Sequence, residues 1–208
     1  MPRLMDMGLD QLNSLLLDMA TLSQEAVSAS IDAYTHGNKS PEVKQMSDRL
    51  RALHRQVSDL SMEMIARYQP VATDLRFLKA CLEISYGFFR YGRYALDITQ
   101  VMDMFGDLSK CDRTSVVETA HKTQEMIRMS VEAFARRDVE MARRIPAMDD
   151  AVDDLYKDNL KKTIQGKGNI QCSLSATLIL RYLERIADHA TYIGESVEYI
   201  ATGVEPPS

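Results

Sequence analysis

The chain has little of several features on which other classes of protein depend. No apolar run approaches the roughly 20 residues that a membrane-spanning helix needs. Basic residues do not predominate: 25 Lys and Arg stand against 30 Asp and Glu, and a net charge of −5 gives no support to nucleic-acid binding. The three cysteines (Cys81, Cys111 and Cys172) lie far apart without metal-type pairing, so we expect buried or free thiols in a reducing compartment. These absences predict a soluble, cytoplasmic protein.

Glycine and proline are also few. Nine Gly and six Pro in 208 residues leave long stretches of high helix propensity uninterrupted, and no alternating strand pattern is convincing. Glycines at 37, 106 and 203 are suited to helix exits, and Ser40 followed by Pro41 is typical of an N-cap and first helical position. The punctuation predicts six helices, at about 6–36, 41–68, 71–104, 112–137, 139–164 with a bend near Pro146, and 172–201.

The predicted helices contain an internal repeat. Three segments recur about 95 to 102 residues apart and in the same order: 30–34 with 130–134, 46–53 with 148–155, and 89–95 with 184–190. The sequence therefore predicts an all-α fold of two tandem three-helix bundles, divided near residue 108 into residues 1–107 and 108–208.

Acidic residues flank the apolar face of the predicted helix 139–164. On a helical wheel centred on Val152, Asp149 and Asp153 fall at about 60° and 100°, beside the buried face. Asp150 and Asp154 point away from that face at about 160° and 200°. The wheel therefore predicts one pair of carboxylates at the rim of the bundle and one solvated pair.

The last predicted helix repeats this arrangement. Glu184 and Asp188 fall about 100° and 140° from Leu183, which lies in the apolar stripe. Two such helices packed together would bring four carboxylates to one rim, and close like charges are unfavourable unless a proton or cation intervenes. Oxygen ligands suit Mg, Ca, Mn or iron better than thiophilic metals. The alternative is that these acids pair with nearby bases such as Lys157, Arg181 and Arg185.

Three segments resemble a known family. Residues 69–76 (QPVATDLR) are similar to the QPVAxDLR turn of the PhoU phosphate-signalling proteins. Residues 184–190 (ERIADHA) are similar to that family's ERIGDHA helix motif, with alanine in place of glycine. Residues 149–156 (DDAVDDLY) resemble its DxxVDxLY segment. The resemblance covers about residues 5–203, nearly the whole chain.

The resemblance implies a cytoplasmic regulator, often a homodimer. It implies that the protein represses phosphate uptake by contacting the ATPase of a phosphate ABC transporter and, in many bacteria, a sensor kinase. Members of the family can carry multinuclear metal clusters, often iron or zinc, on acidic motifs in each repeat, and magnesium is a further option. On this basis Asp149, Asp153, Glu184 and Asp188 are the expected metal ligands.

The first repeat departs from the family pattern at these positions. Its four equivalent residues are Ser47, Arg51, Phe89 and Arg93, and none is a carboxylate. We therefore expect a divalent metal or cluster at the second repeat only. The two arginines could form salt bridges, could bind an anion through paired donors, or could simply lay their stems on the bundle with their heads in water.

Two other function classes are open. A helical bundle could equally be a cytoplasmic module of another ion transporter, because a fold does not fix its partner. A metal-dependent hydrolase or redox enzyme is a third possibility. It has no support from an arrangement of nucleophile and base, so we expect no enzyme activity. His189 diverges by about 100° from the adjacent Asp188 and should not face the same ion.

Overall fold

The computed structural model describes residues 4–38, 40–166 and 168–204. Of these residues, 87% are helical and none lies in a strand, which confirms the all-α prediction. The helices are α1 (Leu4–His36), α2 (Glu42–Tyr68), α3 (Ala72–Phe105), α4 (Thr114–Arg136), the short α5 (Val139–Ala142), α6 (Pro146–Ile164) and α7 (Ile170–Thr202).

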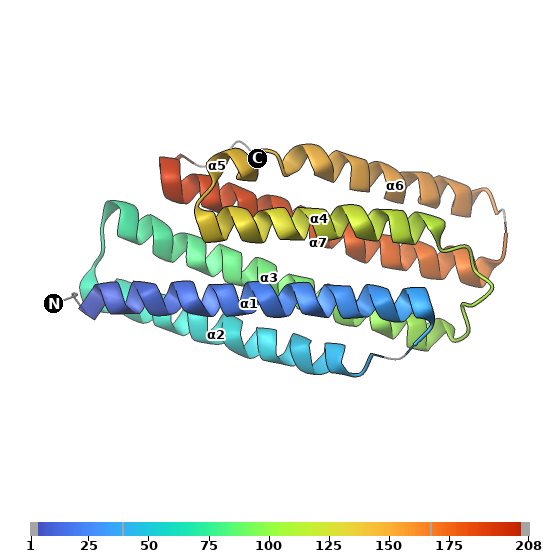
Figure 1. The fold of residues 1–208 in the computed structure, drawn as a ribbon, viewed down its shortest axis with the longest axis horizontal. Helices are drawn as coiled ribbons and strands as arrows, with labels where there is room; N and C mark the ends of the chain where they lie inside the picture. The colour runs from blue at the N-terminus through green and yellow to red at the C-terminus, as the bar shows by residue number, and fades with distance from the viewer. Residues whose placement is uncertain (1–3, 39, 167, 205–208) are drawn as a thin grey trace.

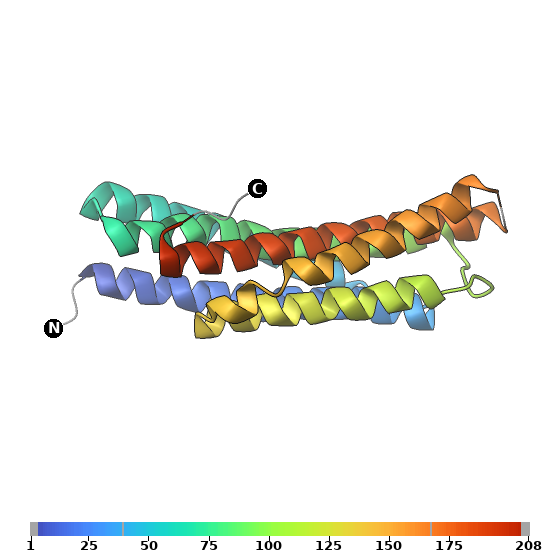
Figure 2. The same ribbon diagram turned by 90° about the horizontal axis from the view of Figure 1, so that it is seen from above.

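The long helices form two three-helix bundles that pack side by side. Helices α1, α2 and α3 contact one another, as do α4, α6 and α7 (Figure 1). The most extensive contact joins the two bundles through α3 and α7, and α1 also contacts α4. Figure 2 shows α3 and α7 in one layer over α1 and α4 in the other. Helices α2 and α6 lie at opposite edges of the molecule, so each half presents one outer helix (Figure 1).

The close contact between α3 and α7 depends on a small residue. A Cβ atom on Gly87 of α3 would lie only 2.9 Å from the Ile193 side chain of α7. Real side chains do not approach so closely, so any larger residue at position 87 would push the two bundles apart or force Ile193 to move.

The repeat is visible in matching interactions. Ser30 in α1 and Ser130 in α4 are both fully buried, and each hydroxyl donates a 2.8 Å hydrogen bond to the carbonyl three residues earlier. Tyr34 and Phe134, four residues further on, are both buried in the core. The proposed division at residues 107 and 108 falls in the connector between α3 and α4, and it stays a prediction.

Two details of the helix ends differ from expectation. The predicted helix 139–164 is not bent but broken into α5 and α6, because Pro146 has no amide hydrogen to donate and instead opens a new helix. Asp138 caps α5 by accepting a hydrogen bond from the Met141 amide. Ser40 does not cap α2: it donates to the Glu42 carboxylate at 2.6 Å, and the helix begins at Glu42. The three predicted glycine exits do have positive φ angles.

The prediction for two of the three cysteines was wrong. Cys111, in the connector after α3, forms a disulfide with Cys172 in the first turn of α7, and only Cys81 is a buried free thiol. The two bonded residues are 61 positions apart in sequence. The sequence spacing hid their proximity, because the end of α3 and the beginning of α7 meet at the same end of the molecule (Figure 1).

No helix in the described part of the chain combines the length and the hydrophobicity needed to cross a lipid bilayer.

Candidate functional site

The structure places the acids of α6 as the helical wheel predicts. Val152 is fully buried, and Asp149 and Asp153, one turn apart beside it, are partly buried. Asp150 and Asp154 are exposed on the other side of the helix. The rim pair and the solvated pair are therefore confirmed as different environments on one helix.

The acids of α7 lie deeper. Glu184 is only 7% exposed, next to the fully buried Leu183, and Asp188 one turn further on is partly buried. Because α6 packs against α7, this pair faces the pair on α6.

The four carboxylates are close enough to oppose one another's ionisation. Burial, together with the charges of Asp188, Asp153 and Glu184, raises the pKa of Asp149 to about 7. Burial and then Asp188 raise the pKa of Glu184, against the lowering effect of Arg181. Burial and then Asp153 raise the pKa of Asp188. The arrangement therefore favours a proton or a cation at this rim.

Basic side chains satisfy part of the cluster. Arg181 donates to Glu184 from one turn away, and Lys157 pairs with Asp153 at 3.1 Å, so the ion-pair alternative holds for two of the four acids. Two other carboxylate oxygens of the cluster, Asp149 Oδ1 and Glu184 Oε2, are buried without a hydrogen-bond partner. Within the described residues, no three His, Cys, Asp or Glu side chains are arranged to hold a metal ion. The ligand set stays a prediction.

The equivalent positions in the first bundle form a different kind of contact. The Arg51 guanidinium lies over the Phe89 ring, 5.9 Å from its centroid, and Arg93 pairs with Asp97 at 2.7 Å. Ser47 is buried, with its hydroxyl unpartnered. Of the three options for the arginines, Arg93 takes the salt bridge and Arg51 rests on an aromatic ring. The first bundle therefore offers no carboxylates at these four positions.

A family model for the PhoU domain matches residues 16–102 and again residues 116–197, one match on each half. The chain belongs to the PhoU family. The two matches lie on either side of the connector between α3 and α4.

Known PhoU proteins are similar over nearly their full length. A phosphate-specific transport system accessory protein PhoU homolog of Zymomonas mobilis is 29% identical, and the alignment covers 97% of this chain and 88% of the relative. The phosphate-specific transport system accessory protein PhoU homolog of Synechocystis sp. is 30% identical, and the alignment covers 90% of this chain and 87% of the relative. The crystal structure of PhoU from Pseudomonas aeruginosa superposes with a TM-score of 0.88 at 26% identity, over 96% of this chain and 99% of that one.

The first segment shared with the PhoU family forms the turn between α2 and α3. Gln69 ends α2 with φ 46°, and Ala72 opens α3 with φ 48°, both in the left-handed region that non-glycine residues seldom adopt. Arg76 donates to Thr73 in the first turn of α3. Two residues in a sparsely populated backbone conformation therefore lie on either side of Pro70 and Val71 in this turn.

An aromatic cluster that was not predicted from the sequence lies between α3 and α7. His189 does avoid the acidic rim, as expected, but its ring instead lies among Tyr86, Tyr94 and Tyr192, with centroid distances of 5.8, 5.8 and 5.6 Å. Burial lowers the pKa of His189 to about 4, so this ring is neutral at physiological pH. The repeat carried a signal for this contact, because Tyr94 and His189 hold equivalent positions in residues 89–95 and 184–190.

Proposed function

We propose that this chain is an accessory regulator of phosphate transport. The observation that carries the proposal is the pair of PhoU-domain matches, one on each three-helix bundle. It is supported by relatives that align over 97% and 90% of the chain and are named accessory proteins of phosphate-specific transport systems.

The proposed action is repression. When phosphate is plentiful, the protein lowers uptake by binding the ATPase of a phosphate ABC transporter, and it informs a sensor kinase where one is present. It works in the cytoplasm as a homodimer, through protein contacts rather than through chemistry of its own.

Deletion of the gene tests the repression. We expect the deletion strain to keep taking up phosphate, or to keep expressing phosphate-starvation genes, when phosphate is abundant. Complementation with the intact gene should restore repression. Unchanged uptake, accumulation and gene expression in the deletion strain would contradict the proposal.

A pull-down tests the partner. The tagged protein, incubated with lysate of phosphate-replete cells, should retain the ATPase subunit of a phosphate transporter. Retention of the ATPase of a different ion transporter, with no phosphate transporter component, would instead support the alternative of a module for another transport system.

We also propose a divalent cation or multinuclear cluster at the second bundle, held by Asp149, Asp153, Glu184 and Asp188. The all-oxygen set suits iron or magnesium and can accept zinc. The two buried oxygens without hydrogen-bond partners, on Asp149 and Glu184, are the strongest support for this site. A bound cation would supply positive charge that offsets the mutual repulsion of the carboxylates and would join α6 to α7. The two basic partners of the cluster, Arg181 and Lys157, would then have to turn outward.

A further inference from the structure

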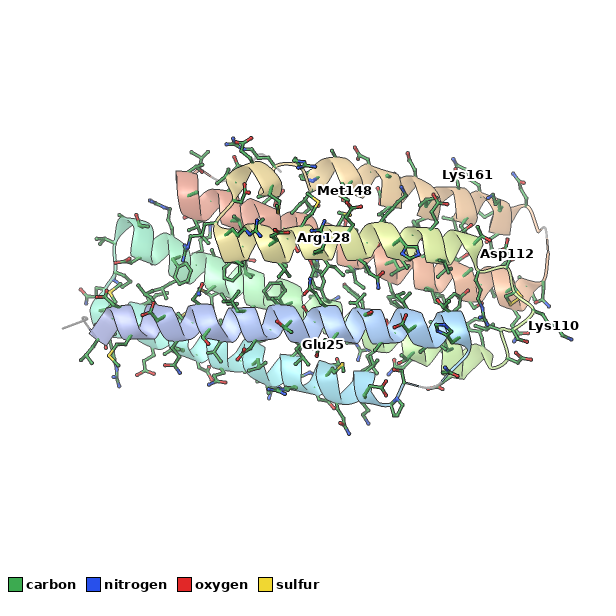
Figure 3. All side chains as sticks on the ribbon, in the orientation of Figure 1. Glu25, Lys110, Asp112, Arg128, Met148 and Lys161 are labelled. Carbon is green, nitrogen blue, oxygen red and sulfur yellow. A yellow bond between two sulfur atoms is a disulfide. The ribbon has the colours of Figure 1, made fainter. Side chains whose placement is uncertain are left out.

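The disulfide lies on the segment that connects the two halves of the molecule. Cys111 belongs to the connector between α3 and α4, and Cys172 belongs to the first turn of α7, with 5.3 Å between their Cα atoms. Figure 3 labels Lys110 and Asp112, the two neighbours of Cys111, at the end of the bundle where this connector runs. The disulfide therefore ties the connector to the second half.

The same connector forms one wall of a large cavity. The cavity has a volume of about 880 Å³ and lies at the end of the first bundle, between the last turns of α1 and α3. Gly106, Asp107, Leu108 and Ser109 of the connector line it. Tyr34 of α1 also lines the cavity, and its hydroxyl is buried and has no hydrogen-bond partner. Any movement of the connector therefore changes access to this cavity.

A buried leucine, an arginine and the disulfide help to hold the connector in place. Leu108 is buried, at 6% exposure, in the core. The Arg113 guanidinium donates to the carbonyls of Thr35, in the last turn of α1, and of Leu108. The disulfide is the covalent link among these, so it is the one that a change in redox conditions can break.

The two bonded cysteines are accessible and the third is not. Cys111 and Cys172 are both partly exposed, whereas Cys81 is fully buried, and burial raises its pKa to about 12. Cys81 therefore has little thiolate character and cannot compete in exchange. In a reducing compartment, disulfides of this kind are usually transient and redox-sensing rather than structural.

We propose that Cys111 and Cys172 form a reversible thiol–disulfide site, and that its reduction releases the connector from α7 and opens the cavity beside it. The inference does not depend on the proposed role in phosphate transport. It requires only a dithiol reductant and an oxidant for the return step, such as a disulfide-form thiol compound.

In the exchange reaction, Cys111 is the preferred point of attack and Cys172 is the preferred leaving group. A thiolate of the dithiol attacks Sγ of Cys111, the disulfide breaks, and Cys172 leaves as a thiolate. The N-terminal end of α7 stabilises this leaving charge, because the positive end of the helix dipole favours an anion there. The second thiol of the reductant then displaces Cys111. Two electrons and two protons pass to the protein, and the dithiol becomes a disulfide.

Thiol counting tests the site. Protein purified in air, without reductant, should show no alkylatable thiol while folded, because Cys81 is buried and the other two are bonded. Treatment of the folded protein with dithiothreitol should expose two thiols, which peptide mass mapping should assign to Cys111 and Cys172. Oxidised glutathione should then restore the bond. Reactive Cys111 and Cys172 before treatment, or a bond that resists dithiothreitol until the protein is unfolded, would overturn the proposal.

Hydrogen exchange tests the consequence. Reduction should increase amide exchange in residues 106–113 and in the first turn of α7, while exchange in the second half of α2 (residues 56–68), which does not line the cavity, stays unchanged. The Cys111→Ser/Cys172→Ser variant should exchange like the reduced protein in both redox conditions, and Cys81→Ala should respond to dithiothreitol like the wild type. If reduction leaves exchange of the connector unchanged, the disulfide does not control this segment and the inference fails.

Discussion

The two halves of the molecule use one helix face in opposite ways. In the second half, Glu184 and Asp188 face two aspartates on α6, whereas the equivalent positions of the first half carry no carboxylate and include two arginines. The repeat fixes where these side chains lie, and Ser30 and Ser130 show that even single hydrogen bonds are reproduced. Equivalent geometry therefore does not give equivalent chemistry, because four side chains decide which ion each rim can attract.

The charge difference also changes what each half requires of its neighbours. At the acidic rim, burial and the neighbouring carboxylates raise the pKa values of Asp149, Glu184 and Asp188, and two carboxylate oxygens are left unpartnered. At the other rim both arginines have partners, since Arg93 pairs with Asp97 and Arg51 lies on Phe89, although the Ser47 hydroxyl is unpartnered. The arginines of the first half are therefore satisfied by packing and an ion pair, whereas the second half keeps two buried carboxylate oxygens without a partner.

The largest expected difference between the halves is in metal content. Replacing Asp153 and Asp188 with Asn should abolish metal uptake, because the cluster then has only Asp149 and Glu184 as carboxylates. Replacing Arg51 and Arg93 with Gln should leave uptake intact, because a divalent cation is repelled by that pair and never occupies the first half. Elemental analysis of protein purified without chelator, for the wild type and both double variants, measures this directly. Metal that survives the aspartate changes, or disappears with the arginine changes, would contradict a metal site in the second half.

A matched pair of core residues tests whether the halves fold as one unit. Ile84 of α3 and Ile179 of α7 are both fully buried and are 95 positions apart, in register with the repeat. Each change to Ala should lower the free energy of unfolding by about 2–5 kcal/mol, from lost apolar burial and the cavity left behind. Because α3 and α7 share the most extensive contact, we expect one cooperative transition in each variant.

Urea unfolding followed by circular dichroism measures both the midpoint and the cooperativity. Two separate transitions, with only one of them shifted by each substitution, would show instead that the bundles unfold independently.

The ion pairs of the two halves should differ in strength. Arg93 and Asp97 have side-chain exposures of 36% and 12%, whereas Lys157 and Asp153 have 57% and 33%. Arg93→Met should cost about 1–3 kcal/mol of stability, because it leaves a largely buried carboxylate without its partner. Lys157→Met should change little, since an exposed pair is well solvated and screened. Thermal unfolding of both variants in one buffer gives the comparison, and a larger loss for the lysine variant would contradict it.

Periodicity was sufficient for much of this architecture. Scarce glycine and proline located the long helices, and the wheel separated Asp149 and Asp153 from their exposed neighbours, because burial on a helix follows its 3.6-residue period. The break at Pro146 was harder to foresee, since proline can either bend a helix or begin one. The pattern of residues along single helices does not predict contacts between segments that are distant in the sequence. The disulfide of Cys111 with Cys172 is such a contact, because it depends on how two helix ends meet.

Side-chain pairing at the candidate site was also only partly predictable. The sequence offered both a cation and nearby bases as partners for the acids, and the structure pairs Glu184 and Asp153 with bases while leaving an oxygen of Asp149 unpartnered. Which acid is paired depends on side-chain reach and burial in three dimensions. Neither quantity follows from spacing along one helix.

The smallest expected effect concerns His54, a histidine of the first half whose equivalent position in the second half is not a histidine. His54 on α2 stacks on Phe89, with 5.6 Å between ring centroids, and its Nδ1 lies 2.9 Å from the Ser85 hydroxyl. Burial lowers the pKa of His54 below its ordinary value of 6.5, so the unfolded chain binds its proton more readily than the folded chain. The stabilising contribution of the neutral ring is therefore complete above about pH 6.5 and is lost as the pH falls towards the lower pKa of the folded state.

The repeat provides a matched variant for this test. The position equivalent to His54 in the second half is Tyr156, one residue beyond the segment 148–155, and a tyrosine does not change its charge between about pH 5 and pH 8. We expect the free energy of unfolding of the wild type minus that of His54→Tyr to stay constant above about pH 7 and to fall on acidification below about pH 6.5. Urea unfolding of both proteins across this range measures the difference. A difference that does not vary with pH, or one that grows on acidification, would show that the folded protein holds His54 no less protonated than the unfolded chain.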